Sequence, residues 1–267
     1  MTTQADKAQQ FVELHQSGTF IMANFWDAGS AVILEKMGFK ALASTSAGAA
    51  QALGKLDSQL TLDEKLTHLA QVCAATSAPV SADFEHGFAD DPQHAAENLT
   101  RAAHAGIVGA SIEDWSREAT YDLGLAVERI QACAEAKNKL DFPFTLTARA
   151  ENLLRQTGDL DEAIKRLQAY ADAGADVLYA PGLANEEQIT AVLQAVDKPI
   201  NVLFAFMPDM PLSKYKALGV HRISLGGALA NLATGVVLNA ATAMLEEGDF
   251  TWAKNMASGK TINKLLS

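Results

Sequence analysis

Short apolar segments recur along the chain, and a stretch with helical periodicity follows each of them. These segments carry few polar positions, as expected for strands that are buried on both faces of a sheet. We predict eight strands, at residues 20–25, 41–45, 79–84, 108–113, 143–149, 175–180, 199–204 and 221–225.

The segments between the predicted strands begin and end with residues typical of helix termini. Thr61 with Glu64 forms a capping-box pattern, and Asp159 with Glu162 opens a second helix. Gly174 stands just before a predicted strand, where a helix should end. Strands and helices therefore alternate, and this alternation predicts right-handed crossovers and a parallel sheet.

Eight strand–helix units in 267 residues favour a closed barrel. No glycine-rich dinucleotide motif follows the first predicted strand, which counts against an open doubly wound sheet. The expected fold class is α/β, a single (β/α)8 barrel of the TIM type over residues 1–267. We expect a helix near residues 228–246, then a helical tail, residues 247–267. The tail is more apolar than a free terminus should be, so it should pack on another surface, such as a neighbouring subunit.

Composition and charge narrow the class of protein. The net charge is −11 and no basic tract is visible, which argues against nucleic acid and anionic membrane surfaces as partners. The N-terminus lacks the layout of a signal peptide, and charge or glycine interrupts the most apolar stretches short of a membrane span. Cys73 and Cys133 fall in helical segments and are expected to be reduced. We therefore expect a cytoplasmic protein with no membrane partner.

Acidic and basic residues follow three of the predicted strands. Asp83 lies at the end of the third and Glu85 just after it, Glu113 ends the fourth and Arg149 ends the fifth. In a parallel barrel these ends meet at one mouth, where carboxylates repel or pair unless a cation joins them. Hard carboxylate oxygens suit Mg²⁺ or Mn²⁺. The alternative is a set of helix caps and structural ion pairs, which is compatible with a site because a buried arginine can fix a carboxylate and still meet a substrate.

Small and hydroxylic residues follow the second predicted strand. The segment from Ser44 to Ala50 allows close backbone approach, and its hydroxyls and amides can form a nest for an anion. A tight strand-to-helix turn is the alternative interpretation. Farther on, Asp57 either reaches into the mouth or caps the following turn.

Seven motifs occur in a fixed order along the chain. They are Asn24-Phe-Trp26-Asp27-Ala-Gly-Ser30-Ala, Thr45-Ser46-Ala47-Gly48, Leu-Gly54-x-x-Asp57, Asp83-Phe-Glu85-His-Gly87-Phe, Gly109-Ala-Ser-Ile-Glu113-Asp114, Ala148-Arg149 and Ala-Asp176-Val-Leu-Tyr179-Ala-Pro181-Gly182. In order and spacing the chain resembles the isocitrate lyase and phosphoenolpyruvate mutase superfamily over nearly its whole length. Members bind magnesium and small α-keto or α-hydroxy acids, and they make or break C–C or P–C bonds next to the keto group.

The resemblance implies roles for the matching positions. Asp83 and Glu85 would be associated with the metal, Mg²⁺ or alternatively Mn²⁺, and Glu113 would hold a water bound to it. Asp57 would belong to the active site. Arg149 would steady the developing enolate oxygen.

The resemblance also implies how substrate and subunits are held. The substrate carboxylate would contact the turn formed by Thr45, Ser46, Ala47 and Gly48. Independently of the resemblance, the residues themselves suggest that Trp26 walls the pocket, with core packing as the alternative. Asn201, inside the seventh predicted strand, is either a polar group near the substrate or a core amide whose hydrogen bonds are satisfied. Members are helix-swapped dimers that pair into tetramers, so we expect a homo-oligomer, a dimer or a homotetramer.

One departure from the superfamily limits the expected reaction. Lyase members carry a Lys-Lys-Cys-Gly-His loop after strand four, whose thiol acts as the acid, whereas residues 115–123 here form a short segment without Cys or His. Cleavage of isocitrate or methylisocitrate by that thiol is therefore not expected. Glu85 also replaces the aspartate of the mutase Asp-x-Asp motif.

We predict a Mg²⁺-dependent carbon–carbon lyase or decarboxylase that acts on a small α-keto or 2-hydroxy acid through a metal-stabilised enolate. A P–C bond mutase or hydrolase acting on a phosphonopyruvate-like compound is the first alternative. A catalytically degenerate barrel that binds a metabolite is the second. No lysine ends a predicted strand, which argues against a Schiff-base aldolase.

Overall fold

The computed structural model describes residues 2–16 and 18–267. Eight parallel strands close into a barrel in sequence order, with β8 paired to β1. Each predicted strand is confirmed, with bounds that differ by two residues or fewer. The strands are β1 (Phe20–Phe25), β2 (Leu42–Ser44), β3 (Val80–Asp83), β4 (Gly109–Glu113), β5 (Thr145–Arg149), β6 (Val177–Tyr179), β7 (Ile200–Leu203) and β8 (Arg222–Ser224).

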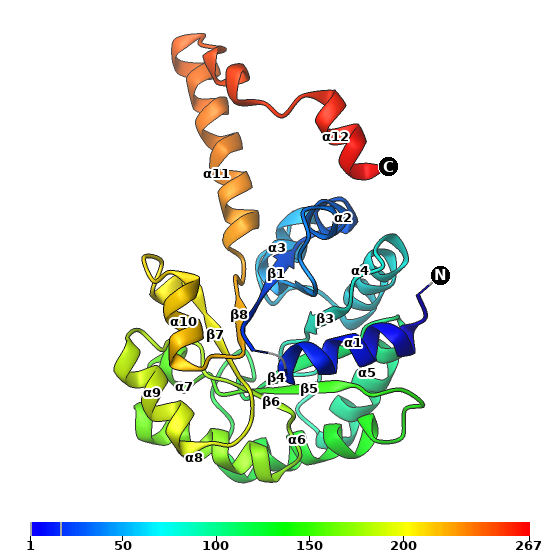
Figure 1. Ribbon diagram of the computed structural model, residues 1–267, viewed down its shortest axis with the longest axis vertical. Coiled ribbons are helices and arrows are strands. Elements are labelled where there is room, and N and C mark those ends of the chain that lie inside the picture. The colour runs from blue at the N-terminus through cyan, green and yellow to red at the C-terminus, as the bar shows by residue number, and fades with distance from the viewer. Residues whose placement is uncertain (1, 17) are drawn as a thin grey trace.

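Helices surround the barrel and connect its strands (Figure 1). The longer ones are α1 (Gln4–Gln16), α2 (Ala28–Lys36), α3 (Ser46–Ala52), α4 (Leu62–Ala75), α5 (Pro92–His104), α6 (Leu123–Lys137), α8 (Leu160–Asp172), α9 (Glu186–Ala195), α10 (Leu212–Leu218), α11 (Ala228–Thr242) and α12 (Gly259–Leu266). Shorter turns are α7 (Asn152–Arg155), η1 (Phe204–Phe206), η2 (Ala243–Glu247) and η3 (Thr251–Asn255).

Local sequence explains where several helices begin. Thr61 and Glu64 form the predicted capping box at α4, with each side chain bonded to the backbone of the other residue. Asp159 caps α8 through the amide of Glu162. Such caps satisfy amides that have no partner within the helix, and they fix each helix relative to the strand before it.

Helix α1, which the sequence analysis did not predict, packs against one end of the barrel. Phe11 on this helix is fully buried with Met22, Ala43 and Val108. A methyl group placed on Gly109 of β4 would lie 2.8 Å from a ring carbon of Phe11, so the helix approaches the strand as closely as glycine permits. Helix α1 therefore closes the end of the barrel at which the strands begin.

Helix α11 leads away from the barrel instead of covering it, and the chain then returns so that α12 packs on α2 (Figure 1). Four large apolar side chains of α11 are more than half exposed: Leu232 (65%), Val236 (62%), Val237 (66%) and Leu238 (62%). Residues Ala228–Glu247 form the one helix in the described part of the chain with the length and hydropathy to span a membrane, which by itself is weak evidence for such a role. The expectation that apolar stretches are interrupted well short of a span is wrong here, because Gly235 does not break the helix.

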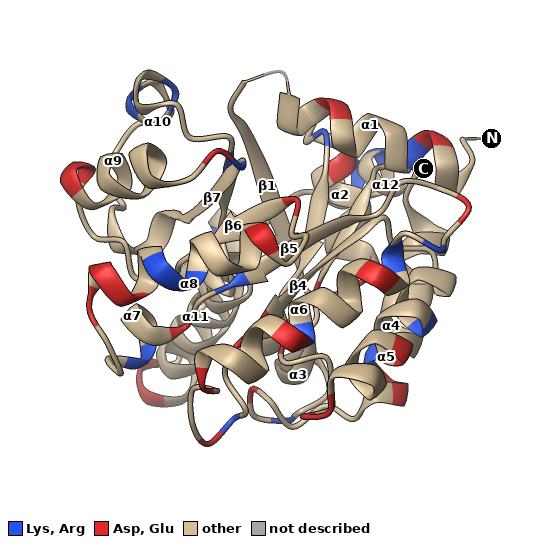
Figure 2. Ribbon diagram, turned by 90° about the horizontal axis from the view of Figure 1, so that it is seen from below, with Lys and Arg blue, Asp and Glu red and all other residues tan. Residues whose placement is uncertain are grey.

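Charged residues are dispersed over the outer helices and loops. Figure 2 shows blue and red positions interspersed on the ribbon in the described part of the chain, without a single basic stripe. Cys73 is half-buried and Cys133 is buried, and both thiols are free, as expected. Neither feature marks a functional site.

Candidate active site

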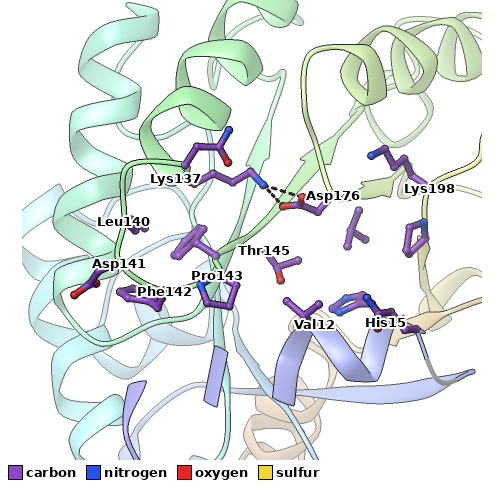
Figure 3. Close-up of a pocket in the computed structure, with 15 residues that line it drawn as sticks. Val12, His15, Lys137, Leu140, Asp141, Phe142, Pro143, Thr145, Asp176 and Lys198 are labelled. Carbon is purple, nitrogen blue, oxygen red and sulfur yellow. Dashed lines mark hydrogen bonds and ion pairs between the residues drawn. The ribbon is translucent and has the colours of Figure 1, made fainter. Parts of the chain in front are cut away.

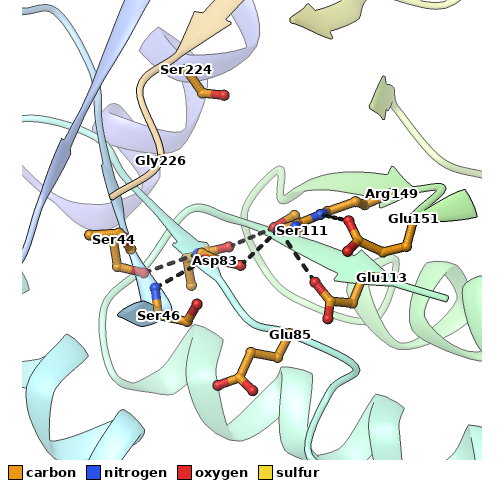
Figure 4. Close-up of polar contacts among 12 residues, drawn as sticks. Ser44, Ser46, Asp83, Glu85, Ser111, Glu113, Arg149, Glu151, Ser224 and Gly226 are labelled. Carbon is orange, nitrogen blue, oxygen red and sulfur yellow. Dashed lines mark hydrogen bonds and ion pairs between the residues drawn. The ribbon is translucent and has the colours of Figure 1, made fainter. Parts of the chain in front are cut away.

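The strand register brings the predicted acidic and basic residues to one mouth. Glu113 of β4 lies directly beside Arg149 of β5, and Asp83 of β3 lies beside Ser111 of β4. These positions are the C-terminal ends of neighbouring strands, where barrel enzymes place their reacting groups. Figure 4 shows Asp83, Glu113, Glu151 and Arg149 turned toward one another.

The backbone at Glu85 differs from the extended conformation that we expected. The sequence analysis placed Asp83 and Glu85 on one extended segment, but β3 ends at Asp83 and Glu85 has a φ of 48°. This left-handed conformation is costly for a glutamate, and it commonly marks functional sites. The extended-segment premise is therefore wrong. The carboxyl group of Glu85 is nonetheless buried, and it lies close enough to Asp83 for that charge to raise its pKa.

Arg149 joins three carboxylates. Its Nη1 lies 3.3 Å from Glu113 Oε2 and 3.5 Å from Asp83 Oδ1, and its Nε donates to Glu151 Oε1 at 2.5 Å (Figure 4). The guanidinium also lies over the ring of Tyr179, 5.3 Å from its centre. A planar fork with several donors is the group best suited to such simultaneous contacts.

Two further cations occupy the site that the sequence analysis did not identify. Arg117, in the short loop after β4, donates to Glu85 Oε2 at 3.0 Å. Lys65 of α4 is fully buried, and its ammonium donates to Ser44 Oγ at 3.2 Å. The cluster therefore contains more positive charge than the strand ends alone supply.

The pKa values of the carboxyl groups diverge. Burial raises the pKa of Glu113 well above its usual value, although Arg149 acts in the opposite direction. Burial also opposes ionisation of Asp83, but Arg149, Lys65 and the Ser46 amide outweigh it and lower the pKa of that carboxyl. Burial, together with the charge of Asp83, also raises the pKa of Glu85. The mouth thus contains one carboxylate that stays ionised, Asp83, beside carboxyl groups with raised pKa values, and such a combination is suited to acid–base chemistry.

The predicted anion turn lies next to this cluster. Thr45 caps α3 by accepting from the Gly48 amide, and the Ser46 amide donates to Asp83 Oδ2 at 3.0 Å. Ala47 occupies the same first turn, within reach of Gly227 beyond β8. The turn is therefore a tight strand-to-helix connection that also places amides beside the carboxylates.

Gly48 is required by the closeness of this turn to its neighbours. A methyl group added there would lie 2.6 Å from Thr45 Cγ2, 2.9 Å from Trp26 Cβ and 3.1 Å from Ala230 Cβ. We expect Gly48→Ala to lower the free energy of unfolding by about 1–3 kcal/mol, as overpacking does. Chemical denaturation measures this change, with Gly235→Ala as the control because nothing lies within 4 Å of a methyl group at that position. Equal loss of stability in the two variants would contradict the packing argument.

The remaining predicted residues lie farther from the cluster or already have partners. Asp57 is exposed, and its Oδ1 accepts from the Ser58 amide. Asn201 is buried between Arg222 and Ser224 and uses both ends of its amide, although it lines a small cavity shared with Arg149. Trp26 is half-buried and borders a cavity beside α11.

The donor atoms at the mouth fit a divalent cation. In the described residues no three acidic, His or Cys side chains form a preassembled metal cage. Glu85 Oε1 is nevertheless buried without a hydrogen-bond partner, which leaves a hard oxygen available beside the ionised Asp83. Buried carboxylate oxygens without partners are costly, and a bound magnesium or manganese ion would satisfy this one.

A larger cavity lies at the opposite end of the barrel, where the strands begin. It has a volume of about 740 Å³ and is bordered by His15 of α1, Phe142 and Lys198 (Figure 3). Lys137 at its edge is paired with Asp176, 2.7 Å away (Figure 3). We assign the site to the mouth despite the size of this cavity, because the carboxylate cluster and the anion turn lie at the mouth. In barrel enzymes the opposite end usually contributes to stability and not to catalysis.

A (β/α)8 barrel with buried carboxylates at the C-terminal ends of its strands has the architecture of a barrel enzyme. A family model described as phosphoenolpyruvate phosphomutase matches residues 11–245. A candidate lyase/mutase from Burkholderia cenocepacia J2315 is 48% identical, with a TM-score of 0.95, over 98% of this chain and 96% of that one.

Two further relatives have named reactions. Oxaloacetate decarboxylase of Bradyrhizobium sp. is 31% identical over 76% of this chain and 72% of its own length. The 2-methylisocitrate lyase of Escherichia coli is 30% identical over 65% of this chain and 61% of its own length. The chain belongs to the phosphoenolpyruvate mutase family, in the isocitrate lyase and phosphoenolpyruvate mutase superfamily, whose matched members include lyases, decarboxylases and phosphonomutases.

Proposed function

We propose that the protein is a magnesium-dependent carbon–carbon lyase or decarboxylase acting on a small α-keto or 2-hydroxy acid similar to oxaloacetate. The observation that carries the proposal is the cluster of carboxylates at the mouth, beside the anion turn. Arg149 joins Asp83, Glu113 and Glu151 there, and the buried Glu85 is held by Arg117. Relatives named as oxaloacetate decarboxylases support the substrate class.

Asp83, Glu85 and Glu113 would hold the divalent cation, Mg²⁺ or Mn²⁺. When bound, the ion would supply Lewis-acid stabilisation of negative charge on the substrate oxygen. The turn of Thr45, Ser46, Ala47 and Gly48 would orient the substrate carboxylate through backbone amides and hydroxyls.

Arg149 would act on the reacting part of the substrate. As a C–C bond next to the keto group breaks, its electron pair moves toward the carbonyl and produces an enolate, which a proton then converts to the keto product. Glu151 and Tyr179 hold the guanidinium in place, which supports a role in which it would meet that oxygen without moving. Preorganised positive charge of this kind lowers the barrier without reorganisation during the reaction.

A panel assay tests this function. Oxaloacetate, several 2-hydroxy diacids and phosphonopyruvate are incubated with the protein and Mg²⁺, and pyruvate, oxalate and phosphate are measured. We expect pyruvate or oxalate from at least one carbon acid, and chelation by EDTA should abolish its formation. Phosphate release from phosphonopyruvate alone would favour the P–C alternative, and no turnover of any compound together with no ligand-induced thermal shift would support the degenerate barrel.

We also propose that α11 is exchanged between subunits of a homo-oligomer, a dimer or a tetramer, in the cytoplasm. The exposed apolar face of α11 supports this proposal, since monomers seldom leave such a surface in water. The free thiols and the acidic charge are consistent with the cytoplasm.

Substitution on α11 tests the assembly. We expect Val236→Asp to shift the protein to a smaller species, because a buried charge in an apolar interface costs several kcal/mol. Analytical ultracentrifugation measures the mass. Gln93→Glu adds the same charge at an exposed polar position of α5, away from α11, and should leave the mass unchanged. An unchanged mass for Val236→Asp would contradict an interface at that face.

A further inference from the structure

Lys65 is fully buried under the mouth, in the first turn of α4. Its ammonium donates to Ser44 Oγ at 3.2 Å, and the same oxygen accepts from the backbone amide of Asp83 at 3.0 Å. Figure 4 shows Ser44 directly beside Asp83. A single hydroxyl therefore connects the ammonium to the residue that would bind the metal.

This ammonium has no direct ionic partner. Among the described residues, no carboxylate oxygen lies within the 4.0 Å of Lys65 Nζ that would make an ion pair. Burial lowers the pKa of Lys65, while the charges of Asp83, Glu85 and Asp57 act against that shift. Burying an unpaired cation is costly, and a nearby cluster of carboxylates offsets the cost.

The mouth brings together equal numbers of acidic and basic side chains of the protein itself. Four acidic and four basic residues make up the cluster, with Lys65 as the one basic residue that does not contact a carboxyl group. They are Asp83, Glu85, Glu113 and Glu151, together with Lys65, Arg117, Arg149 and Arg155. A divalent ion that enters this cluster alone brings two positive charges near the buried ammonium of Lys65, whereas an anionic substrate that enters with it offsets them.

We propose that Lys65 is a positioning residue that balances the charge of the carboxylate cluster, so that a divalent ion binds tightly only together with an anionic substrate. The inference rests on the proposed function, because it concerns the same cation site. Lys65 acts through Ser44 and through its charge and does not itself contact the substrate cavity, whose lining includes Ser44 and Asp83.

Two consequences follow for binding. In the wild-type protein Mg²⁺ and oxalate, a dianionic mimic of the enolate, should each strengthen the binding of the other, as linkage requires. In a Lys65→Met variant the repulsion between the ammonium and the ion disappears. The affinity for Mg²⁺ without oxalate should then rise about tenfold or more, given the size of charge–charge interactions at such sites. The further gain in Mg²⁺ affinity that oxalate produces should be smaller than in the wild-type protein.

Isothermal titration of MgCl₂ into the protein at constant ionic strength and pH 8, with and without saturating oxalate, tests the inference. The matched control is Lys137→Met, which removes a mostly buried lysine near the opposite end of the barrel and should leave the affinity for Mg²⁺ at its wild-type value. Circular dichroism establishes that each variant is folded. If Lys65→Met does not fold, Lys65→Gln takes its place with the same expected increase.

The outcomes separate this inference from the proposed function. Tighter Mg²⁺ binding without oxalate in the Lys65 variant supports a charge-balancing role, and a merely structural role would weaken binding. Unchanged or weaker binding in that variant, with wild-type binding intact, overturns the inference alone. Absence of Mg²⁺ binding in the wild-type and in the variant, even with oxalate, overturns the inference and the metal site together.

Discussion

Replacing Asp83 with asparagine should reduce kcat/KM for the carbon acid identified in the panel by about a thousandfold or more, as loss of a key electrostatic group at an active site does. Asp83 is the carboxylate that Arg149, Lys65 and the Ser46 amide keep ionised. Asparagine keeps the shape but removes the negative charge that would attract the divalent ion. Steady-state kinetics across a range of Mg²⁺ concentrations measures the effect.

The control for this substitution is Asp63→Asn. Asp63 carries an exposed carboxylate that pairs with Arg101 on the outer surface, so its variant should retain wild-type kinetics. Asp83→Asn should also lose any increase in melting temperature that Mg²⁺ and oxalate produce together. Wild-type turnover by Asp83→Asn would show that the reaction takes place elsewhere.

Replacing Arg149 with methionine should lower the free energy of unfolding by about 3–5 kcal/mol, the usual cost of leaving a buried carboxylate without its partner. Glu113 and Glu151 are both buried, and Arg149 contacts both. Activity should fall as well, because the same guanidinium would face the enolate oxygen. Urea denaturation measures the stability, and the assay above measures the activity.

Arg101→Met separates the effect of burial from the general effect of losing an arginine. Arg101 pairs with Asp63 at the surface, where an ion pair contributes about 1 kcal/mol or less. We expect this variant to remain near wild-type stability and to turn over substrate normally. A similar small loss in both arginine variants would mean that the buried ion pairs at the mouth contribute little.

The architecture of the barrel was predictable because its signals are local. Each strand is a short apolar run, and helix starts such as Thr61 carry their own capping pattern. Helix α1 was missed because it precedes the first strand, outside the repeating unit, and its role depends on contact with Gly109 across the barrel end. The direction of α11 was not predictable from periodicity, since an apolar helix fits a barrel wall or a subunit interface equally well.

The site was predictable to the extent that its residues end strands. Asp83, Glu113 and Arg149 meet because parallel strands in register bring their ends together. Lys65 belongs to helix α4, so a search limited to the ends of strands does not find it. A signal was present, because Lys65 lies on the same face of α4 as the buried Leu69 and Val72, an unusual position for a lysine.

Contacts that depend on loop conformation could not be predicted from the sequence. Arg117 approaches Glu85 because the short loop after β4 folds back, with Trp115 bridged to Thr120 and Arg117 itself at a φ of 80°. Glu85 is likewise turned by a left-handed residue conformation. Neither geometry follows from residue type, whereas the proximity of the strand ends does.

A crystal structure determined with excess MgCl₂ and oxalate tests the central claim most directly. We predict an ion at the mouth with Asp83 and Glu85 directed toward it, oxalate beside it, and Glu85 Oε1 no longer without a partner. An empty mouth in such a crystal, with Glu85 still paired to Arg117 and Asp83 still paired to Arg149, would contradict the account.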